Sequence, residues 1–146
     1  MIAIGCDHAG CDMKKAIIDA LSEKGLECKD MGCNGERCDY PVIAEAVCGE
    51  IISGSCEKGI LVCGTGIGMS IAANKIRGIR AAHCSDSFSA RYTRLHNDSN
   101  VLCLGARILG EGLALELVDI FLSTDFEGGR HQKRVDLIKE LENKNN

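Results

Sequence analysis

The chain has 146 residues, a net charge of −4 and an apolar fraction of 45%, values that fit one globular domain over residues 1–146. Only 3% of the residues are aromatic, and lysine and arginine are scattered, so we expect no nucleic-acid partner. No apolar run approaches the roughly 20 residues that cross a membrane, and the N-terminus has no signal-peptide pattern. We therefore expect a cytoplasmic protein without a membrane partner.

Short apolar runs alternate along the chain with segments whose apolar residues recur at helical spacing. The strands predicted from these runs are residues 2–6, 26–31, 60–63, 79–83 and 101–104. A helix is predicted after each strand. A further, C-terminal helix should run from about Arg130 to Leu141, with frayed residues 142–146 after it.

This alternation predicts an α/β fold, a three-layer Rossmann-like domain whose five-stranded parallel sheet is covered by helices on both faces. The second strand alternates polar and apolar residues, as an edge strand does, which favours the strand order 2-1-3-4-5. Ligands bind at the switch point of such a sheet, here between the carboxyl ends of the first and third strands. We therefore expect Asp7 and His8 to face Cys63, Gly64 and Thr65 across one crevice.

A glycine-rich turn, Cys63-Gly-Thr-Gly-Ile-Gly68, follows the third strand and opens a helix. Its glycines let the backbone turn sharply and direct N–H groups at a ligand, beside the partial positive charge of a helix N-terminus. An anion or a developing oxyanion fits there. The turn lacks the lysine of a Walker loop and the third glycine of a dinucleotide fingerprint. Asp86 stands where a ribose-binding acid could lie, so a nicotinamide-dependent oxidoreductase is a weaker alternative.

Cys63 and Thr65 distinguish this turn from other glycine loops. A thiol that faces a helix N-terminus ionises more readily and can act as a base or nucleophile near neutral pH. Cysteines at the ends of buried strands are also often small apolar packing residues. The loop by itself leaves both interpretations open.

Ten cysteines raise the question of disulfides or a metal site. Without a signal peptide the thiols should stay reduced. The chain has no C-x-x-C motif, and Cys28, Cys33 and Cys38 recur at a spacing that matches no zinc or iron–sulfur pattern. We expect most of the cysteines to be packing residues, and no metal or cofactor.

Further polar residues could serve a site or be merely structural. His96 could exchange a proton near neutral pH, or simply sit well at a helix C-terminus; Asn97 follows it. Arg130 and Arg134, four residues apart on one helix face, suit a phosphate dianion or a solvated basic surface. Arg107, after the fifth strand, is a further possible anion contact.

Six motifs together resemble the ribose-5-phosphate isomerase B family, and they cover nearly the whole chain. They are Cys-Asp-His-Ala-Gly at 6–10, Asp-Tyr-Pro at 39–41, Cys-Gly-Thr-Gly-Ile-Gly at 63–68, Ala-Ala-Asn-Lys at 72–75, His-Asn-Asp at 96–98 and Glu-Gly-Gly-Arg-His-Gln at 127–132. The family also includes galactose-6-phosphate and allose-6-phosphate isomerases. The resemblance implies a metal-free intramolecular oxidoreductase that interconverts an aldose phosphate and a ketose phosphate through an enediolate. It also implies a homodimer or tetramer with the site at the subunit interface.

The resemblance assigns a role to each candidate residue. Cys63 looks like the base that moves the proton between C1 and C2, His96 like the ring-opening acid helped by Asp7, and Thr65 like a proton-handling hydroxyl. The remaining assignments are an anion hole from the amides of Gly64, Thr65, Gly66, Ile67 and Gly68, a sugar-hydroxyl contact from Asn97, and phosphate contacts from His8, Arg107, Arg130 and Arg134. The C-terminal arginine helix is expected to serve the Cys63 loop of the partner.

The sequence does not determine which sugar phosphate is the substrate. Ribose 5-phosphate is the first expectation from the resemblance, in the non-oxidative branch of the pentose phosphate pathway. Allose 6-phosphate and galactose 6-phosphate are alternatives, because the loops that would measure substrate length cannot be sized from sequence. A non-catalytic phosphate-binding module, with Cys63 as inert packing, is the alternative of another class.

Overall fold

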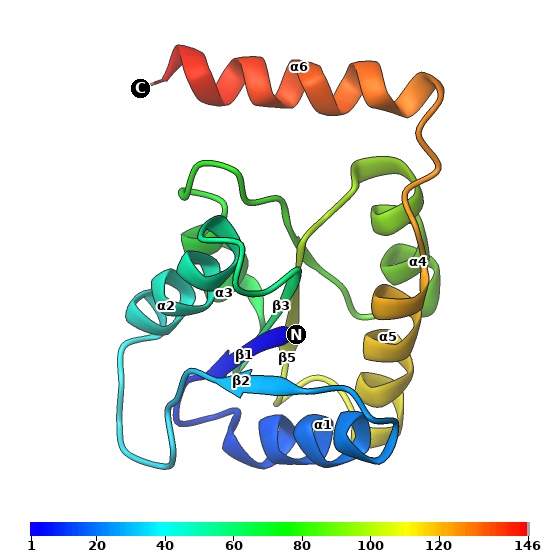
Figure 1. Cartoon of the computed structure of the whole chain (residues 1–146). Helices are drawn as coiled ribbons and strands as arrows, with labels where there is room; N and C mark the ends of the chain where they lie inside the picture. The colour runs from blue at the N-terminus through cyan, green and yellow to red at the C-terminus, as the bar shows by residue number, and fades with distance from the viewer. Residues whose placement is uncertain (146) are drawn as a thin grey trace.

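The computed structural model describes residues 1–145 and contains a five-stranded parallel sheet with helices on both faces (Figure 1). The strands are β1 (Ile2–Cys6), β2 (Cys28–Asp30), β3 (Lys58–Cys63), β4 (Ala81–His83) and β5 (Val101–Gly105). The helices are α1 (Cys11–Glu23), α2 (Tyr40–Ile52), α3 (Ile67–Ala73), α4 (Ser87–Asn97), α5 (Glu111–Ser123) and α6 (Arg130–Lys144). The predicted α/β class is confirmed, and α6 continues to Lys144, beyond the end expected from the sequence.

The strand order is β2-β1-β3-β5-β4, so the switch point lies between β1 and β3 as expected. At the far edge the last two strands are exchanged relative to our expectation. The strand beside β3 is β5, with Gly59 paired to Val101 and Cys63 to Gly105. All five residues of β5 are buried, whereas the three residues of β4 are partly exposed. The longer, wholly apolar strand therefore takes the position that is covered on both faces.

Alternate residues of the central strands pack into two cores, one on each face of the sheet. Ile4 and Ile60 point towards α1 and α5 and pack with Phe121, whereas Leu61 and Cys103 point towards α2 and α3. All of these side chains are fully buried. Each buried Ile, Leu or Phe contributes roughly 1.5–3 kcal/mol, so the two cores hold the carboxyl ends of the strands in fixed positions.

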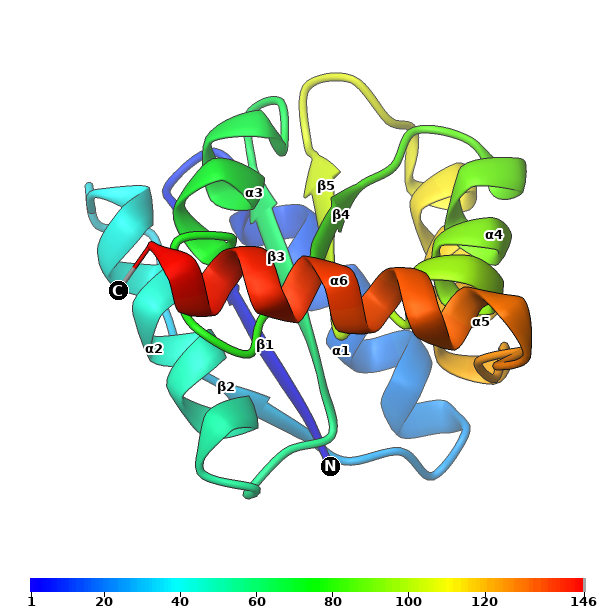
Figure 2. The same ribbon diagram turned by 90° about the horizontal axis from the view of Figure 1, so that it is seen from above.

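Two helices decide where the polar residues of the C-terminal half lie. Asp86 caps α4, its Oδ1 accepting a hydrogen bond of 2.7 Å from the N–H of Ser89. Helix α4 runs antiparallel to the strands and ends at Asn97, away from their carboxyl ends. Helix α6 crosses the molecule beside this end of α4 (Figure 2).

Candidate functional site

The Cys63 loop leaves the carboxyl end of β3 in a tight turn. The Cys63 thiol is buried, and its Sγ accepts a hydrogen bond from the N–H of Gly66 at 3.1 Å. The Thr65 hydroxyl oxygen accepts a hydrogen bond from the N–H of Ile67 at 3.2 Å. Among residues 1–145 no partner is recorded for the N–H groups of Thr65 and Gly68, so these two donors remain open to a ligand.

Two glycines make this turn possible. Gly66 has φ +84°, and a Cβ there would lie 2.9 Å from the backbone of Leu104. A Cβ on Gly105 would lie 2.5 Å from the carbonyl oxygen of Thr65. The loop therefore rests directly on the backbone of β5, and α3, only seven residues long, begins at once after it.

Asp7 lies beside this loop, as the sequence predicted. Its N–H donates to the carbonyl of Val62 at 3.1 Å, and Cys6 pairs with Val62 in the β1–β3 register. The Asp7 residue is 8% exposed, and its Oδ1 accepts a hydrogen bond of 2.9 Å from the N–H of Ala9. His8 is exposed next to it. Asp7, His8 and the Cys63 loop thus form one polar edge at the switch point.

Arg107 belongs to the same edge. Its N–H donates to the carbonyl of Gly64 at 3.0 Å, and its side chain lies over Gly64, with Nη1 3.5 Å from the position of a Cβ. An exposed guanidinium beside loop amides is suited to an anion.

His96 and Asn97 do not lie at this edge, because they end α4 at the opposite side of the sheet. The Nε of Arg80 donates to the carbonyl of Asn97 at 2.9 Å, and the N–H of Gly59 donates to the carbonyl of Asn100 at 2.9 Å. These contacts fix the end of α4 at the amino ends of β3 and β4. The length of β3 separates this region from Cys63 by roughly 16 Å, at about 3.3 Å per residue.

Helix α6 brings further polar residues to the His96 side. The rings of His96 and His131 are stacked, with centroids 3.9 Å apart. The Glu127 carboxylate lies 4.0 Å from Nε2 of His96 and 3.8 Å from Nε2 of His131. Burial, with the charges of His96 and Arg130 adding to it, lowers the pKa of His131. Sequence reasoning gave His131 and Glu127 no role of their own, although both lie in the 127–132 motif.

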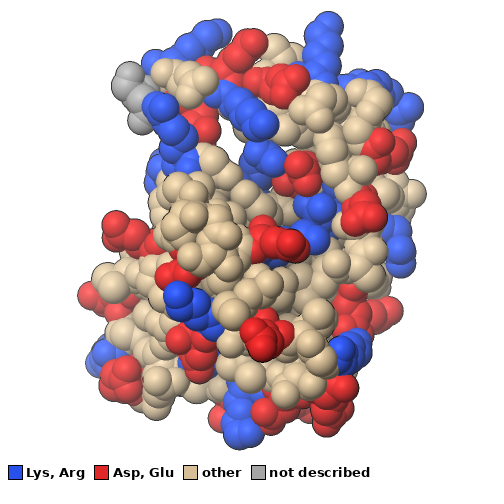
Figure 3. Space-filling view, viewed as in Figure 1, with Lys and Arg blue, Asp and Glu red and all other residues tan. Residues whose placement is uncertain are grey.

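Arg130 and Arg134 are exposed on α6. Figure 3 shows Lys and Arg side chains gathered on and beneath this helix. Within one chain these basic residues are on the same side as His96, not beside Cys63. The predicted site residues therefore fall into two half-sites. The first comprises Asp7, His8, residues 63–68 and Arg107; the second comprises His96, Asn97, Arg130 and Arg134.

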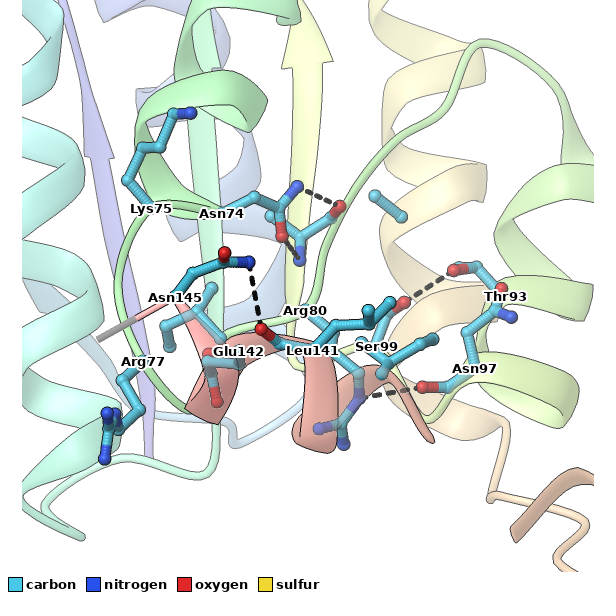
Figure 4. Close-up of a pocket in the computed structure, with 14 residues that line it drawn as sticks. Asn74, Lys75, Arg77, Arg80, Thr93, Asn97, Ser99, Leu141, Glu142 and Asn145 are labelled. Carbon is cyan, nitrogen blue, oxygen red and sulfur yellow. Dashed lines mark hydrogen bonds between the residues drawn. The ribbon is translucent and has the colours of Figure 1, made fainter. Parts of the chain in front are cut away.

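A cavity of about 880 Å³ lies beneath α6, between that helix, the end of α3 and the end of α4 (Figure 4). Asn97 and Arg80 line it from the body, and Ile138 and Leu141 line it from α6. No residue of the Cys63 loop lines it, so the cavity borders the second half-site without completing it.

Two residues that sequence reasoning gave no role lie against the glycine loop. A Cβ on Gly66 would be 2.8 Å from Cδ2 of His83, and one on Gly68 would be 2.6 Å from the ring of Tyr40. Tyr40 lies in the Asp-Tyr-Pro motif, so the sequence did contain a feature that could have indicated this residue. His83 follows from the position of β4 and had no sequence signal of its own.

A doubly wound α/β sheet with a thiol, a carboxylate and open amides at its switch point defines a small-molecule enzyme of the Rossmann-like class. The chain belongs to the ribose/galactose isomerase family, whose model matches residues 2–138. It is an aldose–ketose isomerase of sugar phosphates. This family membership sets aside the alternatives of a nicotinamide-dependent oxidoreductase and a non-catalytic phosphate-binding module.

Similarity to individual proteins extends over the whole chain. Ribose-5-phosphate isomerase B of Escherichia coli (strain K12) is 49% identical over 146 residues, covering 99% of this chain and 98% of the relative. A solved ribose-5-phosphate isomerase B of Clostridium thermocellum superposes with a TM-score of 0.97 at 49% identity, covering 99% of each chain. The ribose-5-phosphate isomerase B of Mycoplasma genitalium, solved with bound ribulose 5-phosphate, superposes with a TM-score of 0.93 at 40% identity, covering 97% of this chain and 95% of that chain.

Residues 1–145 contain no helix with the length and apolarity needed to span a membrane.

Proposed function

We propose that the protein interconverts ribose 5-phosphate and ribulose 5-phosphate, in the cytoplasm, as a step of the non-oxidative pentose phosphate pathway. The observation that carries the proposal is the Cys63 thiol, held in a loop of open amides beside the Asp7 carboxylate. The names of the similar proteins supply the substrate.

Cys63 acts in this proposal as the base that carries a proton between C1 and C2 of the open-chain sugar. Removal of that proton places negative charge on the neighbouring oxygen. The open N–H groups of Thr65 and Gly68 are available to meet it, whereas those of Gly66 and Ile67 donate to Cys63 Sγ and Thr65 Oγ1. One such donor contributes roughly 2.7–4 kcal/mol in measured cases. Because the loop is held against Gly105, it needs little rearrangement when the enediolate forms. The Thr65 hydroxyl donates a proton to that oxygen or accepts one from it.

The other residues open and hold the sugar. His96 protonates the ring oxygen while Asp7 assists, and Asn97 holds a sugar hydroxyl. His8, Arg107, Arg130 and Arg134 contact the phosphate. Binding energy from the phosphate, remote from the reacting carbons, orients the substrate and expels water.

The two half-sites call for two chains. Within one chain they are separated by roughly the length of β3, about 16 Å, which is too far for Cys63 and His96 to reach neighbouring atoms of the same sugar. Leu137, Ile138 and Leu141 leave an apolar face of α6 exposed, and Ile67 and Ile71 are exposed beside the Cys63 loop. We therefore infer a homodimer, or a larger assembly of dimers, in which α6 and the end of α4 of one protomer meet the Cys63 loop of its partner.

The decisive experiment measures turnover of ribose 5-phosphate by wild type, Cys63→Ala and Cys56→Ala, all in chelator. Cys56 is a buried cysteine outside both half-sites and serves as the matched control. We expect turnover by wild type and Cys56→Ala, and its loss in Cys63→Ala. An active Cys63→Ala variant would remove the cysteine mechanism while leaving the family intact. An inactive wild type that turns over allose 6-phosphate or galactose 6-phosphate would move the substrate to a six-carbon sugar.

A further inference from the structure

Three thiols from separate elements of the fold meet at the end of β1, outside the Cys63 loop. The Sγ atoms of Cys6, Cys11 and Cys33 all lie within 4.8 Å of one another, and those of Cys6 and Cys11 are 3.8 Å apart. They come from the last residue of β1, the first residue of α1 and the loop after β2. Cys6 and Cys11 have a C-x4-C spacing, which occurs in zinc sites, but Cys33 follows 22 residues after Cys11 and joins them only through the fold, so local spacing did not indicate the cluster.

The backbone fixes these thiols in place. The N–H of Cys6 donates to the carbonyl of Gly32 at 2.8 Å, and the N–H of Cys33 donates to the carbonyl of Cys6 at 2.7 Å. Cys11 is held at the start of α1, where the N–H of Lys14 donates to the carbonyl of Gly10 at 2.8 Å. The sulfur triangle is therefore largely formed before any ligand binds.

The separation of the Cys6 and Cys11 sulfurs matches thiolate coordination, and the third sulfur lies within 4.8 Å of both. Sulfurs bound tetrahedrally at about 2.3 Å from a zinc ion lie about 3.8 Å from one another, the separation found between Cys6 and Cys11. We propose that Cys6, Cys11 and Cys33 form a three-thiolate site for a thiophilic divalent cation, with Zn²⁺ as the physiological ion and Cd²⁺ as its spectroscopic probe. The fourth position takes a water or Cys38. Burial, followed by a hydrogen bond with Cys33, raises the pKa of Cys38 to about 12.

The charge around the cluster favours such a complex. Each thiol that binds loses its proton to solvent, so one divalent cation and three thiols give a complex of charge −1 and three protons. The buried ammonium of Lys14, which is shared with the Asp30 carboxylate, offsets part of that charge. Its Nζ donates to the carbonyl of Cys33 and to the Asp30 carboxylate, each at 2.8 Å. Burial raises the pKa of the Cys6 thiol, and the Lys14 charge opposes that rise.

The cation has a path to the site. A cavity of about 290 Å³ is lined by Cys11, Cys33 and Lys14, and Cys11 is partly exposed. Soft sulfur ligands select Zn²⁺ and Cd²⁺ over the hard cations Mg²⁺ and Ca²⁺. The site touches the proposed catalytic region, because Cys11 Sγ donates to the carbonyl of Asp7 at 3.6 Å. Loss of isomerase activity would not identify the site, however, since Cd²⁺ can also bind Cys63.

The test is direct titration of the reduced, full-length protein with Cd²⁺ under anaerobic conditions. The readouts are the sulfur-to-cadmium charge-transfer absorption and the protons released. The variants are Cys11→Ser, Cys33→Ala and Cys28→Ser; Cys28 is partly exposed like Cys11 but lies outside the cluster. Circular dichroism checks that each variant is folded, and Zn²⁺ competition measures the affinity for the proposed ion.

We expect uptake of one Cd²⁺ per chain with release of about three protons. Cys11→Ser and Cys33→Ala should each weaken binding at least ~100-fold, whereas Cys28→Ser should bind as wild type does. Equal binding by wild type and both cluster variants would overturn the proposal, because the ion would then sit on other thiols. Absence of a saturable charge-transfer band in wild type would overturn it as well. Absence of proton release when the wild type is titrated with Zn²⁺ alone would rule out Zn²⁺ as the physiological ion.

Discussion

The imidazole ring of His131 lies stacked on that of His96, with centroids 3.9 Å apart and ring planes at 15°. The Nε2 of His131 is buried and has no hydrogen-bond partner among residues 1–145. His131 therefore supports one face of the proposed ring-opening acid through packing. Tyr92 packs edge-on against His96, with centroids 5.0 Å apart, so two aromatic contacts define the ring position of His96.

We predict that acid destabilises the fold through His131. Burial lowers the pKa of His131 in the folded chain, whereas an unfolded histidine has a pKa of about 6.5. The unfolded chain then binds more protons, so the free energy of unfolding falls as pH drops below about 6.5. His131→Phe keeps a stacked ring but cannot titrate. Urea unfolding at about pH 7.5 and pH 5.5 should show a smaller loss in His131→Phe than in wild type.

The control for this prediction is His8→Gln, which removes an exposed histidine. It should lose as much stability on acidification as wild type does. Equal losses in wild type and His131→Phe would mean that the pH dependence comes from other groups and that His131 is not held neutral by burial.

Gly105 is predicted to be essential for the geometry of the Cys63 loop. A Cβ there would meet the carbonyl oxygen of Thr65 at 2.5 Å and the Thr65 Cα at 3.0 Å, both backbone atoms, so the loop must move. Gly105→Ala should lower kcat/KM at least ~10-fold and cost about 1–3 kcal/mol in stability. Enzyme assays and denaturant unfolding of the same preparation measure both effects.

Gly112 provides the matched control. It lies in α5, and a Cβ there would meet nothing within 4 Å. Gly112→Ala should leave kcat/KM unchanged and stabilise the fold by about 0.5–1 kcal/mol, because alanine is the better helix residue. A Gly105→Ala enzyme with wild-type kinetics would show that the loop tolerates displacement.

The sequence was sufficient to predict that Asp7 and the Cys63 loop lie together, because parallel strands at a switch point bring their exits together. Asp7 follows β1 and Cys63 ends β3, and the Cys6–Val62 register makes them neighbours. The order of β4 and β5 was not predictable, because strand pairing between distant segments depends on packing rather than on the local pattern. The thiol cluster was missed because Cys33 joins Cys6 and Cys11 only through the fold, and spacing rules detect only ligands that are close in sequence.

Arg94 is predicted to hold the end of α4, and with it His96, in place. The guanidinium is buried; Nη1 donates to the carbonyl of Ser99 at 2.6 Å and to the Asp98 carboxylate at 3.0 Å, and Nε donates to the carbonyl of Thr124 at 3.0 Å. Removing it leaves these acceptors without their charged donor. Arg94→Met should cost about 1–3 kcal/mol in denaturant unfolding.

Arg91, one turn earlier on the same helix, is exposed. Arg91→Met should change the free energy of unfolding by no more than about 0.5 kcal/mol. A cost below about 1 kcal/mol for Arg94→Met would mean that the end of α4 is held by its other contacts.

The proposed division of the site between two protomers predicts complementation between inactive variants. Cys63→Ala disables the first half-site and His96→Asn the second, so each homodimer should be inactive. In a heterodimer, the intact Cys63 loop of one protomer meets the intact His96 of the other, which restores one of two sites. Random pairing of equal amounts makes about half of the dimers heterodimers and so restores about 25% of wild-type sites.

The experiment refolds the two variants together and compares ribose 5-phosphate turnover with that of the variants refolded separately and then mixed. Leu141→Glu, placed on the exposed apolar face of α6, provides the assembly control. Added to both variants, it should weaken association, seen as a shift to monomer by sedimentation, and abolish the recovered activity. Recovery that persists in monomers, or a folded pair of variants that never recovers activity, would mean that one chain completes its own site. The roughly 16 Å between the half-sites would then have to close within a chain, which would require a large movement of α6 and α4.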